Sequence, residues 1–321
     1  MIWRRRPASC IRNLVWIQAS RIRLHCLYVS DSGCTVADDA DVRESLVMRP
    51  RSQLIAWKVA GRVSDRHISA DEVVRVTGWV FNNVTGDHLT LADFVATGDE
   101  EVPAYLEAFG LRYPENNQQT MIEIGSGIGR MTAAFTREFS VVIAADLDSG
   151  FLERCHETVS RYGRADHLRT LEVADGRSLA LGDDCVDFAF SYLTFQHCAR
   201  ADALNLAQEA VRVTRSGGRI ALNFRGPSRL DPLLLPLGLV VRNSFRLPRV
   251  GGWLSQRRSI ARLAWQVSRI SPSEVLATLG GSVDGVTIWS GGAVDDLQGA
   301  FRRGRFDGIN HNHWWITATV S

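Results

Sequence analysis

The sequence predicts an α/β fold: a doubly wound, mostly parallel seven-stranded sheet with helices on both faces and an antiparallel last strand. From residue 120 onward, short apolar runs rich in β-branched residues alternate with amphipathic stretches of about 10–15 residues, which is typical of βαβ units. A glycine-rich loop directly follows the first of these runs. The predicted strands are 120–124, 140–145, 168–173, 185–191, 219–224, 283–289 and 314–320.

Helices are expected between these strands and ahead of them. The predicted helices of the core are 130–139, 149–162, 201–213 and 273–279. Upstream, Ser69 three residues before Glu72 is a capping-box pattern. The stretch 99–110 has apolar residues at helical spacing and ends on a glycine. We therefore expect a helical lead-in that packs on the sheet.

The N-terminal extension differs from the rest of the chain, because it is rich in arginine and has no acidic residue before Asp31. Three interpretations stay open: a disordered basic arm, a targeting segment, or upstream sequence with the true start at Met48. The segment 226–270 is rich in proline and arginine. The family resemblance described below implies a substrate lid there, and a solvated helical face is the alternative. The predicted divisions are 1–50, extension; 51–118, lead-in; 119–225, core; and 226–321, lid and last two strands.

Composition bounds the classes of function. A formal net charge of +2 is too mild to indicate a nucleic-acid partner. The six cysteines form no CxxC pair, so we expect free thiols in a reducing cytoplasm. The chain has no apolar run of the ~18–20 residues that a membrane helix needs. His311 and His313 lack an identifiable third ligand, so no metal site is predicted. The oligomeric state stays open.

The glycine-rich loop reads GxGxG, with Gly125 first and Glu123 two residues before it. A dinucleotide fingerprint would place a third glycine where this chain has Arg130. It would also present the helix N-terminus to a pyrophosphate, beside which an acid is poorly placed. S-adenosylmethionine instead carries a sulfonium and an ammonium group. The acid therefore favours S-adenosylmethionine over NAD.

Two further acids follow the next strands, and ligands of open α/β sheets bind at these carboxyl ends. Asp146 ends the second strand and is expected to accept hydrogen bonds from both ribose hydroxyls, as the acid of dinucleotide-binding folds does. Asp175 follows the third strand and can accept the adenine amino group, while Gly176 allows close approach of the backbone. The fourth strand and its loop, 187–197, should pass the reactive end of the cofactor.

Taken together, these motifs resemble the class I (Rossmann-like) methyltransferases, of the small-molecule type. The resemblance rests on 121–132, 144–148, 173–176, 186–197 and 209–220, and covers roughly 95–225. It implies a methionine-side loop, a ribose acid, an adenine site and a serine near the sulfonium. The cofactor-binding residues it implies are Glu123, Gly125, Ser126, Gly127, Gly129, Arg130, Asp146, Leu147, Asp175, Gly176 and Ser191.

The expected function is S-adenosylmethionine-dependent transfer of a methyl group, by in-line displacement, to an oxygen, nitrogen or carbon nucleophile of a small molecule. Such a reaction depends mainly on positioning and desolvation. A general base is needed only if the nucleophile must lose a proton, and His197 is the candidate. A packing role for this histidine stays open. The first alternative is a catalytically inactive S-adenosylmethionine-binding subunit or regulator. The second, less favoured by the motifs, is an NAD-dependent oxidoreductase.

Overall fold

The structure is a computed structural model of the chain. It describes residues 69–81, 90–112, 114–245, 247–255, 263, 268–290, 302–305 and 312–321. The predicted basic extension, 1–50, and most of the arginine-rich stretch 256–267 lie outside the described residues.

The core is one eight-stranded sheet with the order β3-β2-β1-β4-β5-β8-β6-β7. β8 is antiparallel to both of its neighbours, and every other pairing is parallel. The seven predicted strands and the antiparallel last strand are confirmed, and β7 is a short additional strand at the edge. The strands are β1 Thr120–Ile124, β2 Val141–Asp146, β3 Leu168–Glu172, β4 Val186–Ser191, β5 Thr214–Arg225, β6 Val283–Ser290, β7 Arg302–Arg305 and β8 His313–Val320.

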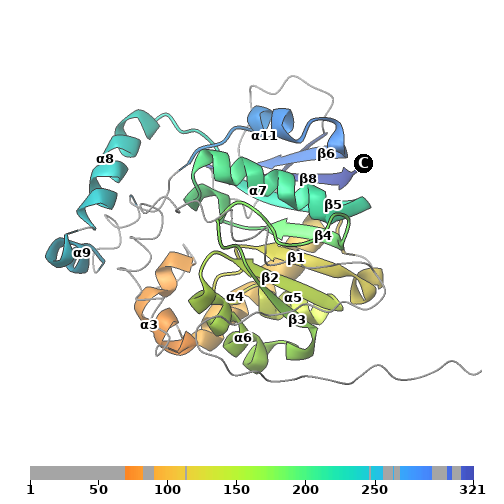
Figure 1. Ribbon diagram of the computed structural model, residues 1–321, viewed down its shortest axis with the longest axis horizontal. Coiled ribbons are helices and arrows are strands. Elements are labelled where there is room, and N and C mark those ends of the chain that lie inside the picture. The colour runs from red at the N-terminus through yellow and green to blue at the C-terminus, as the bar shows by residue number, and fades with distance from the viewer. Residues whose placement is uncertain are drawn as a thin grey trace, which may run out of the picture.

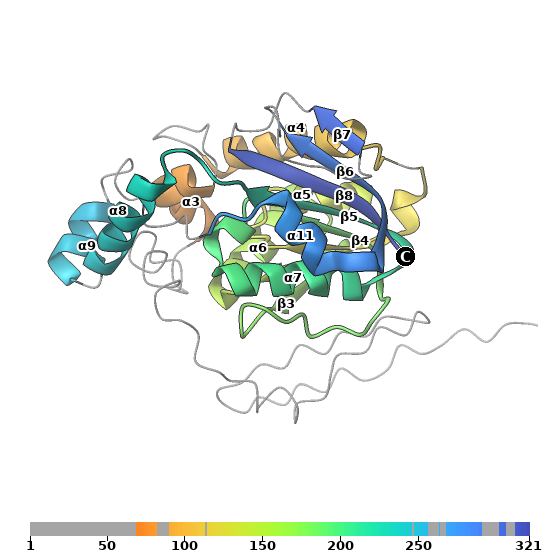
Figure 2. The same ribbon diagram turned by 90° about the horizontal axis from the view of Figure 1, so that it is seen from above.

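Helices cover both faces of the sheet, because a parallel sheet has apolar side chains on both sides (Figures 1 and 2). α7 and α11 pack with one set of strand residues, which includes Ile122 and Leu222. α4 and α5 pack with the opposite set, which includes Met121 and Phe190. The helices of the two layers are α3 Ala70–Phe81, α4 Leu91–Ala108, α5 Thr132–Glu138, α6 Ser149–Tyr162, α7 Arg200–Val213 and α11 Pro272–Leu279.

The lead-in helix α4 starts earlier than the stretch 99–110 predicted for it. Thr90 accepts a hydrogen bond from the backbone N–H of Asp93, and the Asp93 carboxylate accepts one from the Thr90 N–H. This reciprocal cap starts the helix at residue 91. Phe94 and Val95 on the added turns are buried, so packing continues the helix upstream of Asp99.

Two helices of the predicted lid, α8 (Asp231–Ser244) and α9 (Pro248–Ser255), extend from one end of the molecule (Figure 1). α8 continues through Pro236, which sequence rules place at a helix break. The described residues include no helix of the length and apolarity needed to cross a membrane. The exposed large apolar side chains belong to α8, α9 and the residues beside them: Leu230, Leu233, Leu235, Leu237, Leu239, Val240, Leu247, Val250 and Trp253.

Candidate cofactor and acceptor site

The glycine-rich loop leaves β1 in a conformation that side chains rarely adopt. Gly125, Gly127 and Gly129 have φ angles of 83°, 56° and 92°. A Cβ on Gly125 would lie 2.0 Å from Oγ1 of Thr194, in the loop after β4. The loop therefore needs glycine at position 125 both for its backbone angle and for the close approach of the neighbouring loop.

Asp146 links the end of β2 to this loop. Its Oδ2 accepts a hydrogen bond from the backbone N–H of Gly127 at 2.9 Å, and its Oδ1 accepts one from the N–H of Asp148 at 3.1 Å. Burial raises the pKa of the Asp146 carboxyl to about 6, against the lowering effect of these two N–H donors. The predicted ribose acid is thus placed directly beside the glycine loop.

Glu123 is buried on β1, with 4% of its surface exposed. Its Oε2 accepts a hydrogen bond of 2.6 Å from the hydroxyl of Thr132, at the start of α5. Burial raises the pKa of Glu123 to about 7, and this hydrogen bond and the charge of Arg130 only partly oppose it. A cationic ligand would favour the ionised carboxylate, so this buried acid suits a sulfonium or ammonium group.

Arg130 follows the loop and is buried against α4. Nη1 lies 2.9 Å from Oε2 of Glu101 and 3.1 Å from the hydroxyl of Thr97. Its guanidinium carbon lies 6.0 Å from the ring centre of Phe94 and 5.8 Å from that of Tyr192. Arg130 therefore joins the loop to α4, and its implied role toward the cofactor carboxylate stays a prediction.

The predicted adenine residues come together after β3. Asp175 accepts hydrogen bonds of 2.9 Å from the backbone N–H groups of Arg177 and Ser178, which fixes the turn. These donors lower the pKa of the carboxyl, although burial raises it. Gly176 has a φ of 74°, and a Cβ there would lie 3.2 Å from Cδ1 of Leu147. Leu147 and Gly176, from different strand ends, are thus neighbours.

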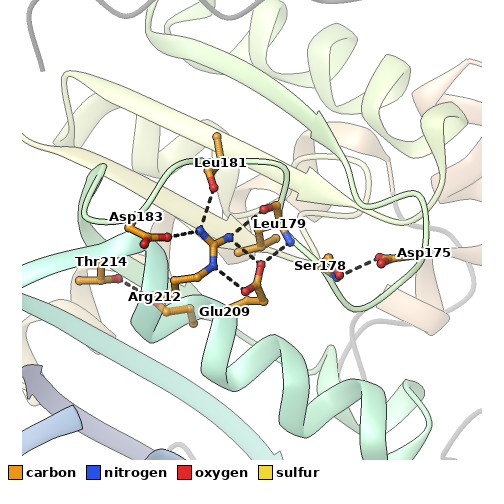
Figure 3. Close-up of polar contacts among 9 residues, drawn as sticks. Asp175, Ser178, Leu179, Leu181, Asp183, Glu209, Arg212 and Thr214 are labelled. Atoms are coloured by element: carbon orange, nitrogen blue, oxygen red, sulfur yellow. Dashed lines mark hydrogen bonds and ion pairs between the residues drawn. The ribbon is translucent and has the colours of Figure 1, made fainter. Parts of the chain in front are cut away.

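Arg212 of α7 holds the chain that continues from this turn (Figure 3). It donates to the carbonyls of Leu179 and Leu181, each at 2.9 Å, and to the carboxylate of Asp183 at 2.6 Å. A two-point ion pair with Glu209 orients the guanidinium. The segment after the predicted adenine residues is therefore attached to α7.

Ser191 and His197 frame the loop after β4. The Ser191 hydroxyl is fully buried and donates to the carbonyl of Ile124 at 2.9 Å. This bond ties the end of β4 to the base of the glycine loop. His197 closes a short 3-10 turn, Phe195–His197, and its Nε2 lies 3.4 Å from the amide nitrogen of Gln196. The roles predicted for both residues stay predictions.

Comparison with known proteins bears directly on this geometry. Residues 122–222 match a family model described as a methyltransferase domain. These residues carry the glycine loop, Asp146, Asp175 and the β4 loop. This match covers less than half of the chain, and the glycine loop and the parallel strands β2, β3 and β4 lie within it.

Two curated relatives also match. Malonyl-[acyl-carrier protein] O-methyltransferase of Methylococcus capsulatus is 34% identical over 145 residues, 44% of this chain and 50% of that protein. The biotin biosynthesis bifunctional protein BioHC of Cellvibrio japonicus is 34% identical over 115 residues, 35% of this chain and 21% of that protein. The chain therefore spans half or less of the relatives' length. A possible histamine N-methyltransferase structure from Thermotoga maritima has 14% identity and a TM-score of 0.44, covering 83% of this chain and all of that one.

The residues at the sheet edge fit S-adenosylmethionine, the cofactor that the sequence motifs imply. Glu123, a buried acid whose ionised form a nearby cation would favour, stands on β1 one residue before its end. The acid after β2 lies beside a loop that only glycine can form at its first position. After β3, the apolar side chain of Leu147 lies beside Gly176, where the absence of a side chain lets a ligand approach the backbone. These features match a cation, a ribose and an adenine in that order along the edge.

The sequence predicted His197 but not the basic residues that the structure places near it. Arg225 ends β5 and lies opposite His313, the first residue of β8. His313 is buried, and its electrostatic neighbours include Arg225, His197 and Arg269. No local motif marks this cluster, because it forms only when β8 inserts beside β5, 88 residues further along the chain. The sequence did predict the strands whose ends carry Arg225 and His313.

Proposed function

We propose that the protein is an S-adenosylmethionine-dependent methyltransferase that acts on a small molecule. The observation that carries this proposal is the sheet edge where Glu123, the glycine loop and Asp146 meet. The cofactor supplies an activated methyl group on a positively charged sulfur. The protein has to bind that group, exclude water and hold the nucleophile in line with the methyl carbon.

The proposed binding roles follow the order of the strands. Glu123 faces the cationic methionine end, and the glycine loop lets the backbone approach it. Asp146 accepts the ribose hydroxyls and remains tied to the loop through Gly127. Leu147 and Gly176 contact adenine, and Asp175 keeps the turn in place and presents its second oxygen to the adenine amino group.

The loop after β4 is proposed to position the acceptor. Ser191 and Thr194 hold it against β1 and Gly125, so the loop has little freedom to move away from the methyl group. His197 at its end is the proposed general base for an acceptor that must lose a proton. The relative named as an O-methyltransferase supports oxygen as the first nucleophile to test.

We also propose that α8 and α9 form part of the acceptor lid expected within 226–321. They follow directly on β5, at whose end the acceptor is expected. Their apolar side chains are exposed to an unusual degree for a soluble domain, which is typical of a ligand-covering or partner-binding surface.

The test is calorimetric titration of the full chain with S-adenosylhomocysteine, followed by transfer of labelled methyl groups to a panel of small carboxylic acids, phenols and amines. Binding and transfer support the proposal. Binding without transfer to any compound favours the inactive-subunit alternative. Binding of NAD in place of S-adenosylhomocysteine contradicts the methyltransferase function.

A further inference from the structure

A cluster of basic residues lies at the sheet edge beside the proposed methyl-transfer site. We define the Arg225 cluster as Arg225, His313, Arg269, His197 and Gln196. Arg225 and His313 are cross-strand partners on β5 and β8. Residue 269 is held between them and the β4 loop, because Ser268 N–H donates to the carbonyl of Gln196 and Ile270 N–H donates to that of Arg225.

The cluster is close to the reactive end of the cofactor site. Thr194 contacts Gly125 of the glycine loop, and the 3-10 turn that begins at Phe195 leads directly to Gln196 and His197. The carboxyl ends of β1, β4 and β5 are adjacent in the parallel part of the sheet. A ligand bound at Arg225 would therefore lie on the acceptor side of this edge.

Two arginines of the cluster, Arg225 and Arg269, share the negative charge of Asp231, which forms its ion pair with Arg269. Arg269 pairs with Asp231 at 3.0 Å, and both side chains are 9% exposed. The Arg225 Nε is buried and has no hydrogen-bond partner, and the part of the chain that the structure describes offers the guanidinium no ion pair. Burial and the charge of Arg269 lower the pKa of Arg225 to about 10, although the carboxylate of Asp231 raises it, so Arg225 remains charged at neutral pH.

Two buried polar groups beside Arg225 also lack partners. His313 is 4% exposed and its Nε2 has no hydrogen-bond partner; Gln196 is 6% exposed and its Oε1 has none. Burial and the three neighbouring basic groups lower the pKa of His313 to about 4, so its imidazole is neutral and retains one N–H donor. Unpaired buried polar groups are costly, and a ligand with acceptor oxygens would satisfy the N–H groups of Arg225 and His313, whereas Oε1 of Gln196 needs a donor.

We propose that the Arg225 cluster binds a carboxylate group of the methyl acceptor, an inference that rests on the proposed methyltransferase function. A planar guanidinium matches the two oxygens of a carboxylate, and the one positive charge by which Arg225 and Arg269 exceed Asp231 matches a monoanion. The neutral imidazole of His313 supplies a further hydrogen bond without adding charge. A phosphate dianion would leave one negative charge unmatched. The acceptor class is therefore small organic acids.

The experiment measures binding of butyrate to the full-length protein by saturation-transfer NMR, with and without S-adenosylhomocysteine. Butyramide is the uncharged analogue of the same shape. The variant Arg225→Gln removes the charge but keeps a polar side chain, and Arg229→Gln removes an exposed arginine four residues away. We expect butyrate to bind and butyramide not to bind. We also expect Arg225→Gln to weaken butyrate binding at least about tenfold and Arg229→Gln to leave it unchanged.

Equal binding of butyrate and butyramide, or unchanged butyrate binding in Arg225→Gln, would overturn the proposal. The affinity of Arg225→Gln for S-adenosylhomocysteine reports whether this variant is folded. If Arg225→Gln does not fold, Arg225→Lys takes its place; it keeps the charge and should retain part of the butyrate affinity. Failure of the wild-type protein to bind S-adenosylhomocysteine would contradict the proposed function but not the carboxylate site, because butyrate binding without cofactor is measured separately.

Discussion

A buried acid at position 123 makes the protein's stability depend on pH. The pKa of Glu123 is about 7 in the folded protein, against a usual value of 4.5. The folded state therefore holds a proton that the unfolded state releases, and stability falls as the pH rises from about 4.5 through 7. Glu123→Gln mimics the protonated acid. We expect it to be about 2–3 kcal/mol more stable than the wild type at pH 8 and equal to it at pH 4.

Urea denaturation without cofactor, at both pH values, measures this difference. Glu172→Gln, which removes an exposed acid on β3, is the control and should change stability little. The same substitution at 123 should weaken S-adenosylmethionine binding most at pH 8, where the wild-type carboxylate is ionised. A Glu123→Gln protein less stable than the wild type at pH 8 would show that the carboxylate has a cationic partner in the free protein.

A methyl group at residue 125 should disrupt the contact between the glycine-rich loop and the loop after β4, which carries Thr194. In Gly125→Ala, the Cβ would lie within 2.6 Å of three Thr194 atoms, and the φ of 83° would add strain. Gly110 has a similar φ of 64°, and a Cβ there would have nothing within 4 Å. Gly110→Ala therefore measures only the cost of placing alanine in this backbone conformation, about 1 kcal/mol. We expect Gly125→Ala to cost more than Gly110→Ala in thermal unfolding and to lose S-adenosylhomocysteine binding. Equal costs would contradict the steric argument.

At the scale of elements, two side chains of α7, Arg212 and Glu209, hold the loop after Asp175. Arg212→Met removes the donors to the carbonyls of Leu179 and Leu181 and leaves Glu209 with the backbone N–H of Leu179 as its partner. We expect amides 177–184 to exchange hydrogen about tenfold or more faster, while the strands stay protected. Arg215→Met, which removes a single ion pair from a half-exposed arginine near the end of the same helix, is the matched control. Unchanged exchange in Arg212→Met would show that Glu209 and the packing of the loop hold it without Arg212.

The elements that the sequence predicted are those whose signal is local. Strand runs, helix periodicity and the glycine loop depend on neighbours in the chain, and they placed Glu123, Asp146 and Asp175 at the correct strand ends. α8 passes through Pro236 although the local rule places a helix break there, and only three of its residues are buried. The Thr90 cap was a readable signal, since Asp93 stands three residues later. The Arg225 cluster was not readable, because its members meet only through the β5–β8 pairing.

At the scale of the whole molecule, the two ends of the described chain meet in one core. Trp315 of β8 is fully buried. Its ring centre lies 4.9 Å from that of Tyr105 and 5.1 Å from that of Phe109, both at the end of α4 or just after it. It stacks on Tyr192 of the β4 loop at 5.4 Å, with 8° between the planes. One side chain thus joins the lead-in helix, the last strand and the loop at the proposed methyl-transfer site.

Removal of this ring should therefore destabilise the whole domain. For Trp315→Ala we expect a loss of about 3–5 kcal/mol, the usual cost of truncating a large buried aromatic side chain. Trp253→Ala, on α9 with 49% of the residue exposed, should cost far less and serves as the control. Urea unfolding is followed by circular dichroism and by tryptophan fluorescence. Because α4 and β8 share this core, both probes should shift together in Trp315→Ala. Separate transitions would mean that α4 is stabilised independently of β8, and that Arg130 could be released from Glu101 without unfolding the sheet.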